Sequence, residues 1–161
     1  MELFLENVKA FFSNYLLMSA VVAWLLAQII KIFTGVYRDR HVSLSVLLFS
    51  TGGMPSSHSA SVLGLTTAAA LQEGFGSTAF AICGILSIIV IIDAMGVRYE
   101  TGKQSKMLNK IVKEMFTDTE NAETHFKEFI GHTPLQVVCG AITGFAVAML
   151  MSLIPVFGFW A

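Results

Sequence analysis

The sequence predicts an all-α fold: a polytopic membrane helix bundle with four transmembrane spans and a cytoplasmic amphipathic helical insertion. Of its 161 residues, 55% are hydrophobic and 13% are charged, and the mean hydropathy is +0.70. A soluble domain carries roughly 25% charged residues, so this is a membrane composition. Four stretches approach or exceed the about 20 apolar residues that a helix needs to cross the hydrocarbon layer. They leave no room for a separate soluble domain, so residues 1–161 are expected to form a single membrane domain.

The first half of the chain contains two of the four predicted spans. The first runs over about 13–34, and Lys31, whose side chain can reach the interface, closes its apolar run. The second runs over about 54–72, and Pro55 suits its first turn, where the missing N–H would be unpaired anyway. Between these spans, residues 42–50 form an apolar run that is too short to cross the membrane. We interpret this run as an interfacial or re-entrant piece.

The third predicted span, at about 78–98, leads into the amphipathic insertion. Its apolar core ends in Asp93 and is followed by Arg98. The insertion, 99–131, is the only long polar stretch of the chain. Within 108–116, apolar residues recur at helical spacing and lysines fall on the other face. This pattern predicts an amphipathic helix at the membrane surface.

The fourth predicted span, at about 133–156, opens with two residues that are typical of a helix start. Thr133 is a capping residue, and Pro134 suits the first turn. Gly140 and Gly144 form a G-x-x-x-G pattern further along this span. That pattern predicts close packing against another helix, because small residues let two backbones approach.

The order of the spans brings charged and histidine side chains to one face of the membrane. The end of the first span, the start of the second, the end of the third and the start of the fourth must share a side. Those ends carry Lys31, Arg38, His58, Arg98 and His132. Nine of the ten lysine and arginine residues fall on or beside this face, and only Lys9 falls on the other. The positive-inside rule therefore predicts that the face is cytoplasmic and that both termini lie outside.

The segment G-G-M-P-S-S-H-S at 52–59 has the composition of an anion site. The N-terminus of a helix presents unpaired N–H groups and the positive end of its dipole, and Ser56 and Ser57 can add hydroxyl donors. His58 adds an imidazole at the same helix end. The alternative is a serine-rich helix cap with a histidine at the level of the lipid headgroups.

His132 stands at the start of the fourth span and so at a second helix N-terminus. Imidazole changes charge near neutral pH, so one ring can attack phosphorus while the other protonates the leaving oxygen. Interfacial capping is the alternative for His132 alone, and its pairing with His58 favours catalysis.

Three cations accompany the two histidines at the same face. Lys31, Arg38 and Arg98 would stabilise the charge on phosphate oxygens. Each of them singly is also the kind of residue that anchors the cytoplasmic end of a span.

Taken in order, these residues resemble the motifs of the type-2 phosphatidic acid phosphatase superfamily, in particular its small divergent bacterial branch. That superfamily shares a helical core with vanadium haloperoxidases. Its first motif, K-x6-R-P, is similar to Lys31 and Arg38, with aspartate in place of the proline. Its second motif, P-S-G-H, is similar to residues 55–58, with serine in place of the glycine.

The third motif of the superfamily, S-R-x5-H-x3-D, resembles two separated segments of this chain. Arg98 matches the first half, and His132 matches the histidine of the second half. Gln136 stands at the position of the aspartate, which in the superfamily orients the histidine and favours its charged form. Asp93 is a candidate to compensate for this change, and the alternative is that it pairs with Arg98.

The resemblance implies an acid phosphatase-type mechanism with His132 as the nucleophile that forms a phosphohistidine and His58 as the acid. It implies no metal or other cofactor. The residues that would hold the phosphate are Lys31, Arg38, Ser56, Ser57 and Arg98. The expected substrate is a membrane lipid phosphate or pyrophosphate, and nucleic acid is not expected as a partner.

Two other functions stay open from the sequence. One is a protein that binds or transports lipid phosphates without hydrolysing them, and the other is a structural membrane protein whose insertion recruits a partner. A homodimer is an expected assembly for any of these functions, since four spans make a thin shell around a site.

Overall fold

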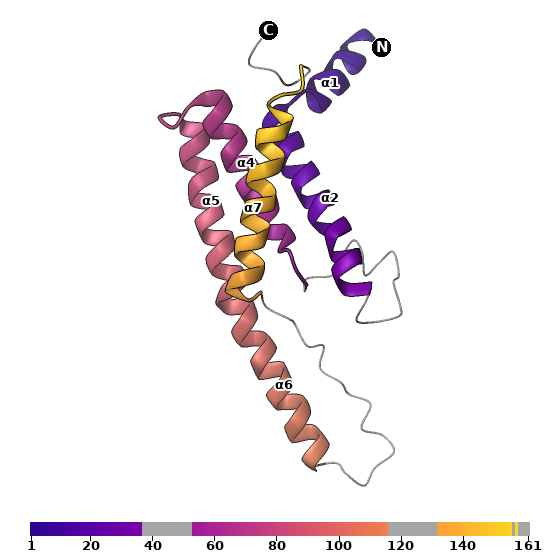
Figure 1. Ribbon diagram of the computed structural model, residues 1–161, viewed down its shortest axis with the longest axis vertical. Coiled ribbons are helices and arrows are strands. Elements are labelled where there is room, and N and C mark those ends of the chain that lie inside the picture. The colour runs from indigo at the N-terminus through magenta and orange to yellow at the C-terminus, as the bar shows by residue number, and fades with distance from the viewer. Residues whose placement is uncertain (37–52, 116–131, 156, 158–161) are drawn as a thin grey trace.

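The computed structural model describes residues 1–36, 53–115, 132–155 and 157, and every regular element among these residues is an α-helix (Figure 1). This confirms the predicted all-α fold. The described helices, in chain order, are α1 (Glu2–Phe12), α2 (Tyr15–Val36), α4 (Ser57–Glu73), α5 (Thr78–Met95), α6 (Val97–Met115) and α7 (Pro134–Met151).

Three stretches of the described helices are long and apolar enough to cross a membrane: Tyr15–Thr34, Thr78–Val112 and Pro134–Met151. The second predicted span, 54–72, corresponds to α4, which has 17 residues and falls short of that length. At about 1.5 Å per residue, α4 is about 25 Å long. It runs beside the longer helices, and a total of four spans stays a prediction.

Small residues bring α4 into close contact with α2 and α7, against which it packs most extensively. A Cβ atom added at Gly140 of α7 would collide with the carbonyl oxygen of Ser56, and one added at Gly144 would collide with that of Ala60. On the other side of α4, a Cβ at Gly64 would lie 3.0 Å from the carbonyl oxygen of Ser19 in α2. The predicted packing role of the G-x-x-x-G pattern is confirmed.

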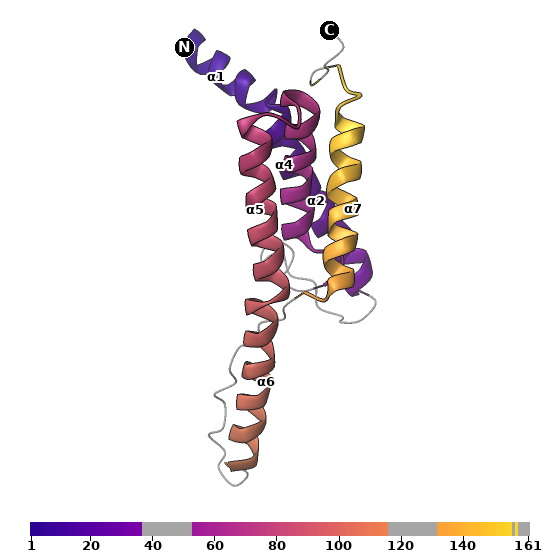
Figure 2. The same ribbon diagram turned by 90° about the vertical axis from the view of Figure 1, so that its left-hand side faces the viewer.

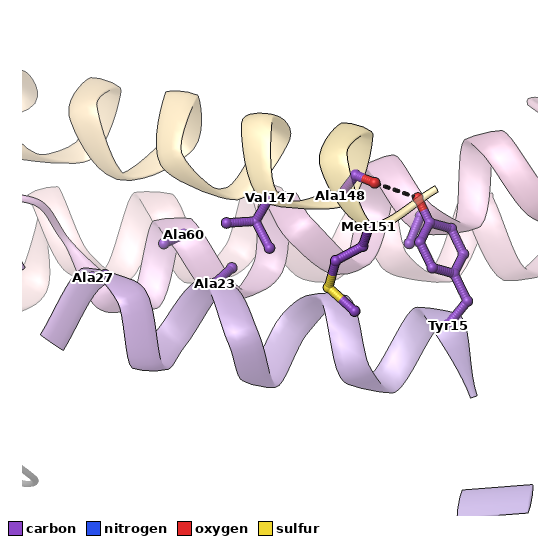
Figure 3. Packing of buried hydrophobic residues seen from close by; sticks show 8 residues of the cluster. Tyr15, Ala23, Ala27, Ala60, Val147, Ala148 and Met151 are labelled. Atoms are coloured by element: carbon purple, nitrogen blue, oxygen red, sulfur yellow. Dashed lines mark hydrogen bonds between the residues drawn. The ribbon is translucent and has the colours of Figure 1, made fainter. Parts of the chain in front are cut away.

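A cluster of mostly small apolar side chains fills the space where α2, α4 and α7 meet (Figure 3). Ala23 of α2, Ala60 of α4 and Val147 of α7 lie together in this cluster. At one end of it, the hydroxyl of Tyr15 donates a hydrogen bond of 2.7 Å to the carbonyl oxygen of Ala148. This contact joins the first residue of α2 to the last turns of α7.

The start of α4 differs from the prediction in the position of Pro55. Ser56 is the N-cap, and its side chain accepts a hydrogen bond from the backbone N–H of Ser59. Pro55 therefore precedes the cap, and its predicted place in the first turn of the helix is wrong. At α7 the prediction is confirmed, because Thr133 is the N-cap and Pro134 is the first helical residue.

Helix α6 continues in the direction of α5 and extends beyond the bundle (Figures 1 and 2). Only Gly96 separates the two helices, and its carbonyl oxygen accepts a hydrogen bond of 3.0 Å from the N–H of Glu100. The helix exposes Met107, Leu108 and Ile111, as expected for an amphipathic helix. Its predicted place at the membrane surface stays a prediction, and the predicted short piece at 42–50 lies outside the described residues.

Candidate functional site

The end of α2, the start of α4, the end of α5 and the start of α7 meet at one end of the bundle, the end from which α6 extends (Figure 1). The hydroxyl of Thr34 donates a hydrogen bond of 2.8 Å to the carbonyl oxygen of Met54. The N–H of Ser56 donates one of 2.9 Å to the carbonyl oxygen of Gln136, and the N–H of His132 donates one of 3.1 Å to that of Ala94. These bonds tie the four helix ends together.

Lys31 is held against the first residue of α4. Its Nζ donates a hydrogen bond of 3.0 Å to Oγ of Ser57, and the two residues are only 8% and 2% exposed. The lysine stem passes close to Gly53, whose φ of +92° is a conformation that favours glycine. A buried cation thus lies beside the N-terminus of α4, and both features attract an anion.

Ser56 is fully buried, and its hydroxyl serves the start of α4. Its Oγ accepts hydrogen bonds from the backbone N–H of Ser59 at 3.4 Å and from the hydroxyl of Ser59 at 3.1 Å. Ser56 thus has the capping role that the sequence left open as an alternative. Its role as a phosphate ligand stays a prediction, whereas Ser57 lies directly beside the lysine.

Gln136 contacts the imidazole of His132, as an orienting group does. Its Oε1 lies 3.2 Å from Nδ1 of His132 and accepts a hydrogen bond of 3.0 Å from the backbone N–H of Thr133. That second bond identifies the amide oxygen, which can only accept. Nδ1 of His132 therefore carries the proton in this contact, and the lone pair of the neutral ring lies on Nε2.

The contact between His132 and Gln136 is part of the start of α7. Thr133 and Gln136 form a capping box, in which each side chain accepts a hydrogen bond from the backbone of the other. The cap holds the Gln136 side chain in place, and the imidazole of His132, which is 2% exposed, rests against it. The spacing T-x-x-Q was a readable sign of this box in the sequence, but it did not reveal that the same amide would also hold the histidine.

His58 and His132 lie 74 positions apart in the chain. They are nevertheless neighbours in the structure. Their ring centroids are 5.9 Å apart, and the ring planes are inclined by 58°. His58 is the second residue of α4, and His132 directly precedes the cap of α7. Two imidazoles thus lie at the positive ends of two helices, close enough to act on one small ligand.

The other predicted residues are placed only in part. Asp93 lies near the end of α5 and is partly exposed, and the next residue, Ala94, accepts the backbone hydrogen bond of His132. Arg98 is the second residue of α6, but its side chain lies outside the described residues, as does the whole of Arg38. Within the described part of the chain, no three His, Cys, Asp or Glu residues lie together in a way that could hold a metal ion.

Thr34 belongs to the site although the sequence did not single it out, and Gly53 belongs to the segment 52–59 that the sequence did single out. The hydroxyl of Thr34 holds the backbone that leads into α4, and Gly53 lies beside the stem of Lys31. No sequence pattern pointed to Thr34, since its bond depends on a segment twenty residues away.

Comparison with known proteins gives a consistent result. A model of the family described as "Divergent PAP2 family" matches residues 12–147. The chain is also similar to "Uncharacterized membrane protein YuiD" of Bacillus subtilis (strain 168), with 35% identity over 151 residues that cover 87% of this chain and 95% of that protein. No solved structure matches the chain.

Proposed function

Because this chain belongs to the Divergent PAP2 family, a membrane family related to the phosphatase superfamily, we propose that it is a metal-independent phosphatase of a membrane lipid phosphate or pyrophosphate. One observation carries the proposal. The imidazole of His132 rests with Nδ1 against Gln136, which puts its lone pair on Nε2, and the ring of His58 lies beside it.

The two histidines divide the chemistry of the proposed reaction. Nε2 of His132 attacks phosphorus, so a P–N bond forms while the P–O bond to the leaving group breaks. His58 in its protonated form gives its proton to the departing oxygen and is left neutral. In the second step neutral His58 takes a proton from water, the resulting hydroxide oxygen attacks phosphorus, and inorganic phosphate leaves His132.

The phosphate group is held by the cationic end of the bundle. Lys31 and the N–H groups at the start of α4 attract the oxygens, and the hydroxyl of Ser57 lies within reach of both. Arg38 and Arg98 complete the proposed set, together with Ser56 through its place at the helix cap.

The position of the site fits a substrate whose tail stays in the bilayer. The spanning helices are about as long as the hydrocarbon layer is thick. The helix ends that carry the site therefore lie near the lipid headgroups. The distribution of lysine and arginine supports a cytoplasmic location for this end of the bundle.

A second candidate function, binding or transport of lipid phosphates without hydrolysis, is favoured by one observation. The group that orients His132 is a neutral amide, and a neutral partner does not stabilise the positive charge that the imidazole takes up during catalysis. The same cationic pocket would then hold the phosphate without cleaving it.

The purified protein in detergent should release inorganic phosphate from at least one member of a panel of lipid phosphates and pyrophosphates, and vanadate should inhibit this release. Lys31→Gln should raise KM about 10-fold to 100-fold, since a charge-assisted contact to phosphate contributes about 1.5–3 kcal/mol. Lys106→Gln, at an exposed position of α6, is the matched control and should leave KM unchanged. Binding of the same lipids without any release of phosphate would favour the second candidate function.

Gln136→Glu should increase kcat by about 10-fold or more, because a carboxylate beside Nδ1 stabilises the imidazolium by at least about 1.4 kcal/mol. Glutamate fits the capping box as well as glutamine does, so the start of α7 should keep its stability. Kinetics and thermal unfolding of this variant are compared with those of Gln104→Glu on exposed α6. An unchanged kcat would mean that orientation of His132 is sufficient and that charge contributes nothing.

We also propose that Asp93 supports His132, since the carbonyl of the next residue holds the His132 backbone. Asp93→Asn should then lower turnover strongly, by about 10²-fold or more, while thermal unfolding stays unchanged. Normal turnover in Asp93→Asn would exclude this role.

A further inference from the structure

The first helix of the chain has a strongly segregated surface that the bundle does not use. Along α1, Phe4, Leu5, Val8, Phe11 and Phe12 fall on one face at helical spacing. None of the residues of α1 is buried, and the side chains of Phe4 and Phe11 are 69% and 54% exposed. The opposite face carries Glu2, Glu6 and Lys9.

Helix α1 is a separate element and not an extension of α2. It ends at Ser13, whose N–H and hydroxyl both donate hydrogen bonds to the carbonyl oxygen of Lys9, at 2.9 Å and 2.7 Å. The next helix then starts with its own side-chain cap, since Oδ1 of Asn14 accepts a hydrogen bond of 3.0 Å from the N–H of Leu17. The chain turns at this corner, and α1 leans away from the bundle in both views (Figures 1 and 2).

The corner also fixes the depth at which α1 lies in a membrane. Tyr15, the first residue of a stretch that can cross the membrane, follows α1 after only Ser13 and Asn14. Exposed apolar side chains, among them Val21 and Leu25, follow along α2, and such side chains face lipid in a membrane bundle. An amphipathic helix at this depth buries its apolar face at the boundary between headgroups and acyl chains.

We propose that α1 is an interfacial helix that lies along the lipid headgroups at the end of the bundle opposite the candidate site. The apolar face of α1 contacts a lipid surface of low charge. The polar face carries two acidic residues and one lysine, so it offers no net positive charge to attract anionic lipids. The apolar face alone drives this contact, which distinguishes α1 from the lysine-rich helix α6.

The test uses the full chain in vesicles of phosphatidylcholine, with Cys83→Ala and Cys139→Ala as the background. Single cysteines at Val8 and Glu6, on opposite faces of α1, carry a spin label. Electron paramagnetic resonance then measures how accessible each label is to oxygen, which concentrates in lipid, and to a water-soluble nickel chelate. We expect the ratio of the two accessibilities to be severalfold higher at Val8 than at Glu6.

Two further comparisons make the test decisive. Labels at Phe11 and Lys9 should repeat the difference between the faces, and vesicles that contain phosphatidylglycerol should give the same ratios as phosphatidylcholine alone. A label at Val8 that meets the nickel chelate as readily as Glu6 does would place α1 in water and overturn the proposal. A label at Val8 that is shielded from both reagents would also overturn it, because a second copy of the chain or another protein would then cover this face.

Discussion

Replacement of His132 with alanine is expected to reduce phosphate release by about 10³-fold or more, because the proposed reaction passes through a bond between phosphorus and this imidazole. Replacement of His58 is expected to cost less, about 10²-fold to 10⁴-fold, which is the usual contribution of a general acid. The two histidines are neighbours in the structure, so loss of activity alone does not separate their roles.

The choice of leaving group does separate them. A nitrophenolate departs readily without a proton, so His58→Ala should release a rapid burst of nitrophenolate from a nitrophenyl phosphate, whereas His132→Ala should release none. Turnover after the burst should be slow in His58→Ala, because the second step still needs His58 as the base. With a ³²P-labelled substrate, rapid quenching should trap an acid-labile phosphoryl label on the protein in His58→Ala and none in His132→Ala. An equal burst of nitrophenolate from both variants would contradict the assignment of the nucleophile.

The neighbourhood of these two histidines could be predicted from the sequence because it depends on little more than the order of the spans. Apolar segments that cross a membrane alternate in direction, so the start of the second span and the start of the fourth have to share a face. The structure joins these starts through the hydrogen bond from Ser56 to the carbonyl of Gln136. The positions of the helix ends were thus predictable to within about one helical turn.

The roles of adjacent side chains were not predictable in this way. Ser56 and Ser57 are both hydroxyl residues at the start of one helix, and only the backbone decides which of them is the cap. In the structure Ser56 takes the cap, while Ser57 accepts the hydrogen bond of Lys31. Pro55, expected in the first turn, precedes the cap for the same reason.

Two helices show why length and apolar content predict some elements better than others. Helix α1 escaped prediction because its 11 residues are too few to cross a membrane and one of its faces is polar. Helix α4 was expected as a span, but it is less apolar than the other predicted spans. It packs among other helices, and a helix in that position needs small side chains more than large apolar ones.

Replacement of Gly144 with valine is expected to break the packing between α4 and α7 and to destabilise the bundle by about 3 kcal/mol or more. The site of a Cβ at Gly144 is already occupied by the carbonyl oxygen of Ala60 and by the backbone nitrogen of Gly64. Backbone atoms cannot move aside as a flexible side chain can, so the two helices have to separate. Gly140→Val should have a similar effect through the carbonyl of Ser56.

Gly84 of α5 provides the matched control, because a Cβ atom added there meets nothing within 4 Å. Gly84→Val should therefore unfold within a few degrees of the wild type when thermal unfolding in detergent is measured, while Gly140→Val and Gly144→Val should unfold far earlier or fail to fold. The separation of α4 and α7 would also pull the carbonyl of Gln136 away from the N–H of Ser56, which are 2.9 Å apart in the structure. If Gly144→Val kept both normal stability and the hydrogen bond between these helices, the close approach of α4 and α7 would not be what holds the two histidines together.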